Sequence, residues 1–252
     1  MRDFDDSTLW RISAYERLTE ATGTSGFVRL EGTAALLPTT LLSDLQTPEG
    51  LPRSDDVLEV MAACIRHRES ALVYLRHGGL VWPVTLFPQR LLYHAPHDPA
   101  DRAENDLSDL SVLGVEPPGL QPPGHWQHER IGHPAHYLPI ERLLWAVALR
   151  GPRRGVLNEI DGPVAYRALR NHEQEALVAP GAMGSALERL HEDAAALRDI
   201  AHWPGMSLER ASRLLNGLYL TTRLMVVRTR HAAPKGAPTE RRPWGSLWKA
   251  RH

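Results

Sequence analysis

The sequence predicts an α+β protein, in which a helix-covered antiparallel sheet domain precedes a mostly helical, winged-helix-like C-terminal domain. Three observations support this class. Apolar residues recur at helical spacing between Val57 and Ile65. Two β-prone runs then flank the Gly78-Gly79 turn, as in an antiparallel hairpin. Near the end of the chain, Pro204-Gly205 separates two apolar-periodic runs, which is the layout of a helix-turn-helix.

The first predicted domain covers residues 1–95 and begins with helical segments. Residues 3–21 have the apolar spacing of one amphipathic helix, and Pro38 is expected to open a short helix that ends at Leu45. Residues 27–31 predict a short strand. Ser54 is the expected N-cap of the helix over 57–65, because the acidic residues that follow it complement the helix dipole.

The same domain is expected to continue as a β-meander. Strands are predicted over 71–76, 80–87 and 91–94, with turns between them. Pro83 lies inside the second strand and cannot donate a ladder hydrogen bond. That strand is therefore expected at a sheet edge or at a bulge.

Residues 96–138 change in character, being acidic and then rich in proline and histidine, and they predict a linker or a long surface loop. Trp126 within them is expected to be buried against one of the two domains. The winged-helix-like domain is predicted over 139–232, and a basic tail over 233–252.

Within the C-terminal domain, each helix has a start or stop signal. Pro139 opens a helix that Gly151 ends, and residues 183–191 form the first helix of the winged unit. Ser207 is the N-cap of the recognition helix. The β-prone residues from Tyr219 to Val227 are expected to form the wing.

Composition restricts the class of protein. Hydrophobic residues make up 42% of the 252, which is enough for a core, and the single cysteine excludes an internal disulfide. No apolar run is long enough to span a membrane, and the acidic N-terminus does not resemble a signal peptide. The many arginines and alanines, with lysine only at 235 and 249, favour a bacterial, cytoplasmic protein. From Trp203 to the end, the sequence contains ten Arg and Lys residues but only two acidic residues, and this excess of positive charge favours a polyanionic partner for this end of the chain.

The residues VLEVMAACIRHRESALVYLRHGGLVWPVTLFPQRLLYHA, from Val57 to Ala95, resemble the PATAN domain, the N-terminal domain of PatA-type response regulators. That family runs helix, basic break, strand, Gly turn, strand, turn, strand, and its Gly-Arg-Ile-Val-His-Ala ending is similar to QRLLYHA at 89–95. The chain departs from the family at Trp82-Pro83 and has no receiver domain. The resemblance implies protein contacts, including control of type IV pilus motors, and a winged-helix-like segment can follow such domains. We therefore expect a non-enzymatic regulatory or scaffold protein without a cofactor. Its expected partner is another protein, and a homodimer is an alternative.

A second hypothesis is a DNA-binding regulator. Arg210 and Arg213 would face outward from the recognition helix toward base edges, while Arg228 and Arg230 would meet phosphates. In the protein-contact interpretation, the tail residues Trp244 and Trp248 lie four apart and would share one helical face against a partner.

A third hypothesis is a metal-dependent enzyme. The run GHWQHERIGHPAH contains four imidazoles that could bind zinc or nickel, at His125, His128, His133 and His136. The zincin motif, the phosphate-binding glycine loops and the Gly-x-Ser-x-Gly motif are all absent from the sequence.

Overall fold

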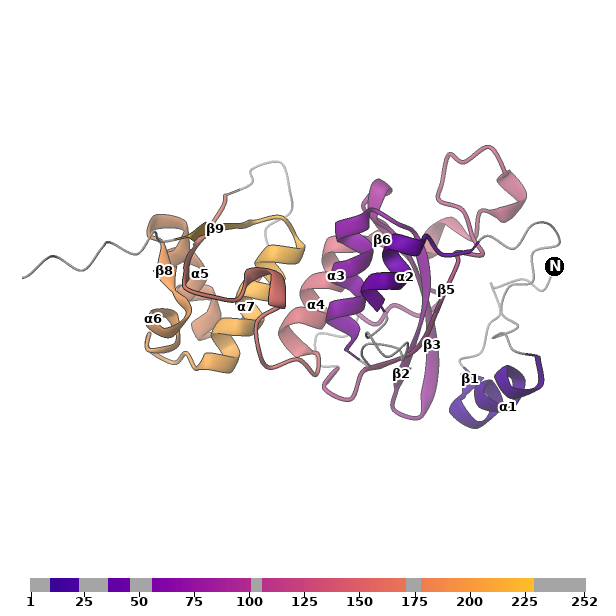
Figure 1. Cartoon of the computed structure of the whole chain (residues 1–252), viewed down its shortest axis with the longest axis horizontal. Coiled ribbons are helices and arrows are strands. Elements are labelled where there is room, and N and C mark those ends of the chain that lie inside the picture. The colour runs from indigo at the N-terminus through magenta and orange to yellow at the C-terminus, as the bar shows by residue number, and fades with distance from the viewer. Residues whose placement is uncertain (1–9, 23–35, 46–55, 101–105, 171–177, 229–252) are drawn as a thin grey trace, which may run out of the picture.

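The computed structural model describes residues 10–22, 36–45, 56–100, 106–170 and 178–228. The strand expected at 27–31, the cap expected at Ser54 and the basic tail lie outside these ranges. The described chain is α+β, with helices and two antiparallel sheets (Figure 1). The helices are α1 (Ile12–Thr22), α2 (Thr39–Leu45), α3 (Val57–His67), α4 (Ile140–Arg150), α5 (Ala182–Glu192), α6 (Leu197–Ala201) and α7 (Leu208–Leu220).

The larger sheet has the order β5-β2-β3-β4-β6, with β1 pairing to β3, and all of its pairs are antiparallel. The predicted hairpin and the third strand are confirmed. The strands are β1 (Trp10–Arg11), β2 (Ala71–His77), β3 (Leu80–Phe87), β4 (Leu92–His94), β5 (Ser111–Glu116) and β6 (Tyr137–Pro139).

The two faces of this sheet bury different side chains, because neighbours along a strand point to opposite faces. Val73 and Leu75 of β2 join the main core with α3 and α4. Leu72 and Tyr74 pack on the other face, where the ring of Tyr15 from α1 lies 5.2 Å from that of Tyr74. Helices thus pack on both faces of the sheet, α3 and α4 on one and α1 against part of the other, beside β1 (Figure 1).

Three local predictions for this region need correction. The N-cap of α3 is Asp56, whose carboxylate accepts hydrogen bonds from the backbone N–H groups of Leu58 and Glu59. Segment 96–138, predicted as a linker or loop, instead supplies β5 and most of β6 to the sheet. Strands β2 and β4 each have backbone N–H and C=O groups that need hydrogen-bond partners on one side, and β5 and β6 provide those partners.

The third correction concerns β3, which is internal to the sheet. However, β1 pairs with β3 only at residues 80–81 and β4 only at 85–87. Pro83 lies between these two paired stretches of β3. On the side of β3 that faces away from β2, no described strand pairs with Pro83. The missing N–H is therefore tolerated.

A three-stranded sheet of order β8-β7-β9 organises the C-terminal part, with β7 at Val164–Ala168, β8 at Ala195–Ala196 and β9 at Leu224–Arg228. The helix α7 begins as predicted, since the Ser207 hydroxyl accepts a hydrogen bond from the Arg210 N–H. Tyr219 and Leu220, predicted in a wing strand, are the last residues of α7. The strand begins only at Leu224, after the positive φ of Thr222 turns the chain.

Helix α4 joins the two parts of the molecule. It packs against α3 on one side and α7 on the other, and its buried residues belong to a single core cluster that runs through both parts (Figure 1). The helices approach closely because α7 has Gly217 facing Trp145. None of the helices in the described part of the chain is both long and apolar enough to cross a membrane.

Candidate functional site

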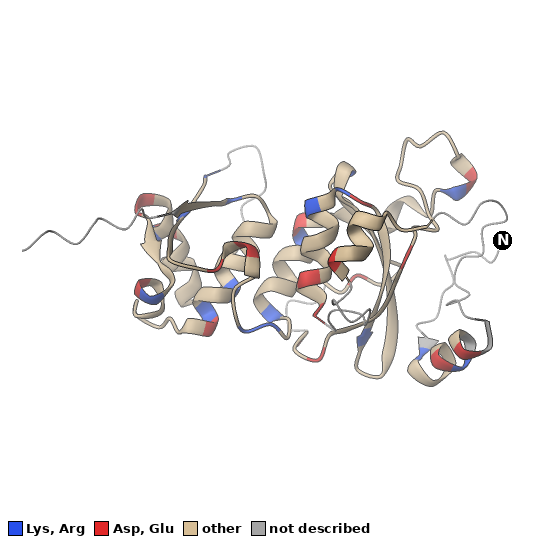
Figure 2. Cartoon of the chain, in the orientation of Figure 1, with Lys and Arg blue, Asp and Glu red and all other residues tan. Residues whose placement is uncertain are grey.

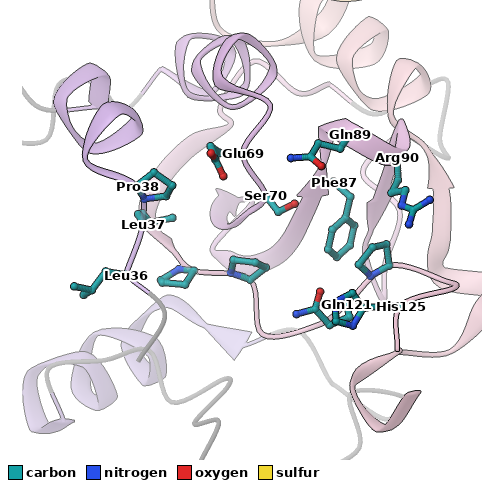
Figure 3. Close-up of a pocket in the computed structure, with 13 residues that line it drawn as sticks. Leu36, Leu37, Pro38, Glu69, Ser70, Phe87, Gln89, Arg90, Gln121 and His125 are labelled. Atoms are coloured by element: carbon teal, nitrogen blue, oxygen red, sulfur yellow. The ribbon is translucent and has the colours of Figure 1, made fainter. Parts of the chain in front are cut away.

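A cleft of about 340 Å³ opens beside the larger sheet (Figure 3). One wall comes from Leu37 and Pro38 at the start of α2. Phe87, the buried last residue of β3, also lines the cleft. The opposite wall is the proline-rich segment after β5, with Pro117, Pro118 and Pro122. Glu69, Ser70, Gln89, Arg90, Gln121 and His125 add polar groups around the rim. A cleft of this size, with both apolar and polar walls, can accept an apolar side chain of a partner while its polar groups form hydrogen bonds with the partner's backbone.

Residues 117–136 continue from this wall as a loop that projects away from the body, at the upper right of Figure 1. Its base is held by several hydrogen bonds. The Gln121 N–H donates to the Arg130 carbonyl at 2.9 Å, and the Tyr137 hydroxyl donates to the Gln121 carbonyl at 2.7 Å. The same hydroxyl accepts from the Gly132 N–H at 2.9 Å. Burial of this phenol raises the pKa of Tyr137, so the hydroxyl remains protonated as the donor.

The tip of the loop presents Trp126 to solvent. Gly124 turns the chain with a φ of +82°, and Trp126 follows it with 76% of its surface exposed. The prediction that Trp126 is buried is therefore wrong, because the Pro-Pro-Gly turn directs it outward. An exposed indole on an anchored loop is unusual for a monomer and typical of an interface residue.

The histidines of this loop, and His94 of β4 beside it, take structural roles. His94 is 2% exposed, and its ring lies 4.8 Å from that of Tyr137 and 5.6 Å from that of His136. Gly132 permits this packing, since a Cβ there would lie 2.8 Å from Nε2 of His94. The Nδ1 atoms of His125 and His133 accept hydrogen bonds from the N–H groups of Gln127 and Ala135.

The proposed metal ligands His125, His128, His133 and His136 are not brought together as a ligand set. The rings of His133 and His136 are 5.4 Å apart, whereas His125 stacks near Trp126 and His128 is exposed. Within the described ranges no group of three or more His, Cys, Asp or Glu side chains could hold a metal ion. The spacing that suggested a metal site instead serves short turns, in which imidazoles bond to nearby backbone groups.

A second cleft, of about 640 Å³, contains a network of ion pairs. Arg66 bridges Asp44 and Glu159, and Arg153 contacts Asp56 at 2.6 Å and Glu59 at 2.7 Å. The hydrogen bond from His67 and the nearby Arg66 cation lower the pKa of Asp44. These acids have cationic partners, so the network ties α2 and α3 to the segment after α4.

The four arginines of the DNA hypothesis have different environments. Arg210 is exposed on α7, and its guanidinium donates to the Gly205 carbonyl. Arg213 does not face outward: its side chain is only 14% exposed and donates to the Leu149 carbonyl at 2.7 Å and to Glu209. Arg228 pairs through its backbone with Val164, and Arg230 lies outside the described residues, as do Trp244 and Trp248.

Sequence reasoning missed the exposure of Trp126 and the cleft beside it. The turn residues Pro122, Pro123 and Gly124 immediately before it were the signal for a surface position. Comparisons of this chain with protein family models, with curated proteins and with solved structures find no match. The interpretation of the site therefore rests on its geometry.

Proposed function

We propose that this protein is a non-enzymatic regulatory or scaffold protein that acts by binding another protein. The observation that carries the proposal is Trp126, a 76% exposed indole on a loop whose base is fixed by hydrogen bonds. Because the loop is already ordered, a partner would bury this ring without a large entropic cost of ordering the loop. The PATAN resemblance of residues 57–95 gives the setting, a signalling or type IV pilus system.

The cleft supports the same proposal. Pro122 and His125 belong both to its wall and to the loop that carries Trp126, and the ring of His125 lies 5.7 Å from the indole, so Trp126 is next to a residue of the cleft wall. The exposed side chain of Leu36, at 84%, adds an apolar edge to this surface. A partner segment could insert one apolar side chain into the cleft while it covers Trp126.

The test compares full-length wild type with Trp126→Ala as baits in the cells that encode the protein. Leu208→Ala is the matched control, because Leu208 is 57% exposed on α7 and distant from the cleft. Loss of a central aromatic contact weakens binding by about 2 kcal/mol, or about 30-fold. The partner should be retained by wild type and Leu208→Ala and lost from Trp126→Ala. Equal retention by all three would refute the proposal.

A DNA-binding regulator is the second candidate, and the arrangement of α6, a turn and the Ser207-capped α7 favours it. Arg210 would be the outward-facing side chain, whereas Arg213 is engaged with α4. Along the described residues of this part of the chain, Figure 2 shows acidic and basic residues interleaved on the ribbon, and this mixture of charge is less favourable to a DNA phosphate backbone than a run of basic residues. Duplex binding measured at about 50 and 200 mM salt would support this function if it weakens with salt and with Arg210→Ala.

A further inference from the structure

The cleft beside the larger sheet is lined by one acid and one base that do not pair with each other. Glu69 is half-buried and Arg90 is exposed, and Figure 3 shows Phe87 between them. Among the described residues neither side chain forms an ion pair or a side-chain hydrogen bond. A molecule that enters the cleft therefore meets both charges without first breaking an ion pair.

Two turns of the chain fix the positions of these charges. Arg68, with a φ of +56°, ends α3 and directs the chain into Glu69. After β3, the 3-10 turn of residues 88–90 carries Arg90. The side-chain amide of Gln89 in this turn donates to the Arg68 carbonyl at 3.0 Å, so the two turns are tied together. The acid and the base are thus held at opposite sides of the cleft.

A second hydrogen-bond donor lies on the Arg90 side of the cleft. Nδ1 of His125 accepts the Gln127 N–H at 3.2 Å, which places the proton of the neutral ring on Nε2. A guanidinium and a ring N–H are both donors, and a carboxylate is an acceptor with two oxygens. This side of the cleft therefore suits an acidic side chain, and the Glu69 side suits a lysine or an arginine.

The cleft is apolar between the two charges. Phe87 is 1% exposed, and Pro117 and Pro118 are half-buried in the opposite wall. An apolar side chain that fills this space excludes water from both sides of the cleft. Ion pairs formed there are stronger than ion pairs in open solvent, because the local dielectric constant is lower.

We propose that this cleft binds an extended segment of the partner protein in which an apolar side chain is flanked by an acidic and a basic residue. The apolar side chain packs against Phe87, the acid pairs with Arg90, and the base pairs with Glu69. The acid lies on the Trp126 side, because the ring of His125 is 5.7 Å from the indole. This inference rests on the proposed function, since it names the chemistry of the partner segment.

The balance of charge argues against a polyanion in the same cleft. Glu69 is the only acid among the described residues that line it, and its charge offsets that of Arg90. Nucleic acids and phosphorylated segments are bound by an excess of basic groups. The apolar surface of Phe87 and the prolines also has no role at a phosphate, whereas it matches an apolar side chain of a peptide.

The experiment uses the full-length protein and an array of short immobilised peptides with leucine or phenylalanine at the centre. Each peptide has glutamate on one side of the centre and lysine on the other, in both orders and at several spacings. Matched peptides have glutamine in place of either charge. Dissociation constants of the best peptides are then measured by fluorescence polarisation for wild type, Arg90→Gln and Glu69→Gln. Arg167→Gln on β7 and Glu192→Gln at the end of α5 are the matched controls, since both residues are exposed.

Wild type should bind the charged peptide about tenfold more tightly than the peptide with glutamine in place of glutamate, the factor that corresponds to about 1.4 kcal/mol. Arg90→Gln should lose this preference for glutamate. Glu69→Gln should lose only the preference for lysine over glutamine. Arg167→Gln and Glu192→Gln should keep both preferences.

The proposal is overturned if no peptide binds, if wild type binds charged and neutral peptides equally, or if either cleft variant keeps the preference assigned to its residue. Trp126→Ala separates this result from the proposed function, because it should weaken binding of charged and neutral peptides alike. Peptides that bind through Trp126 without a charge preference would retain the proposed function and refute the chemistry of the cleft. A charge preference with binding that Trp126→Ala does not weaken would support the cleft chemistry and refute the role of the indole.

Discussion

Replacing Arg213 by Met tests whether this arginine is structural or available to a ligand. Its guanidinium donates to the Leu149 carbonyl, one of the last carbonyls of α4, and pairs with Glu209 one turn earlier on α7. A hydrogen bond from a charged donor contributes about 1.5–3 kcal/mol, and the pair with the 43% exposed Glu209 adds about 0.3–0.5 kcal/mol. Methionine retains the apolar stem, so the free energy of unfolding should fall by about 2 kcal/mol.

Thermal unfolding followed by circular dichroism measures this loss. For a chain of this length the melting temperature should fall by about 4–8 °C. Arg210→Met is the control: Arg210 also donates to a backbone carbonyl, that of Gly205, but this hydrogen bond is exposed to water, so its loss should change stability by less than about 0.5 kcal/mol. The structural assignment would be refuted by an Arg213→Met protein that has the melting temperature of wild type but has lost binding to DNA. That result would support the DNA hypothesis, in which Arg213 faces outward.

Three further outcomes follow from buried contacts. Gly217→Ala gains about 1 kcal/mol of helix propensity, but its Cβ would lie 2.6 Å from the Trp145 ring. We therefore expect Gly217→Ala to lower the free energy of unfolding, measured in urea, by about 1 kcal/mol. In a Trp145→Leu background, where the smaller side chain leaves room for the new Cβ, the same substitution should cost less. A Gly217→Ala protein more stable than wild type would contradict this. Burial raises the pKa of Cys64 to about 12, so the native thiol should resist iodoacetamide and react once the chain is unfolded in urea, and equal rates in both states would be inconsistent with the core. His67 and Arg66 lower the pKa of Asp44, so its contribution to stability is present above the unfolded value of about 3.9 and is lost as pH falls through the lower folded pKa. Asp44→Asn should flatten the fall of the urea midpoint in that acidic range, and an unchanged slope would exclude this origin.

The elements that sequence predicted best are those with local signals. The periodic apolar residues of 57–65, the Gly78-Gly79 turn and the Ser207 cap each act within a few residues, and each lies where it was expected. The cap of α3 was misplaced by two residues because Ser54, Asp55 and Asp56 are all good N-caps. Local preference could not choose among them.

The elements that sequence missed depend on distant partners. Strand β5 lies among acids and prolines, and its six residues are half-buried, so it has little alternation to recognise. It forms because β2 offers a free edge, with Val73 opposite Val115. Tyr219 and Leu220 were expected in the wing but extend α7, because Leu220 is buried in the core and Tyr219 packs against it, and this burial outweighs local propensity.

The loop of 117–136 and strand β9 lie at opposite ends of the molecule (Figure 1). Contacts through α4 hold these ends in one orientation. Arg223, next to β9, pairs with Glu141 of α4 at 3.1 Å, and Arg153, just after α4, pairs with Asp56 at the start of α3. A partner bound at Trp126 would therefore be held at a fixed position relative to the β8-β7-β9 sheet.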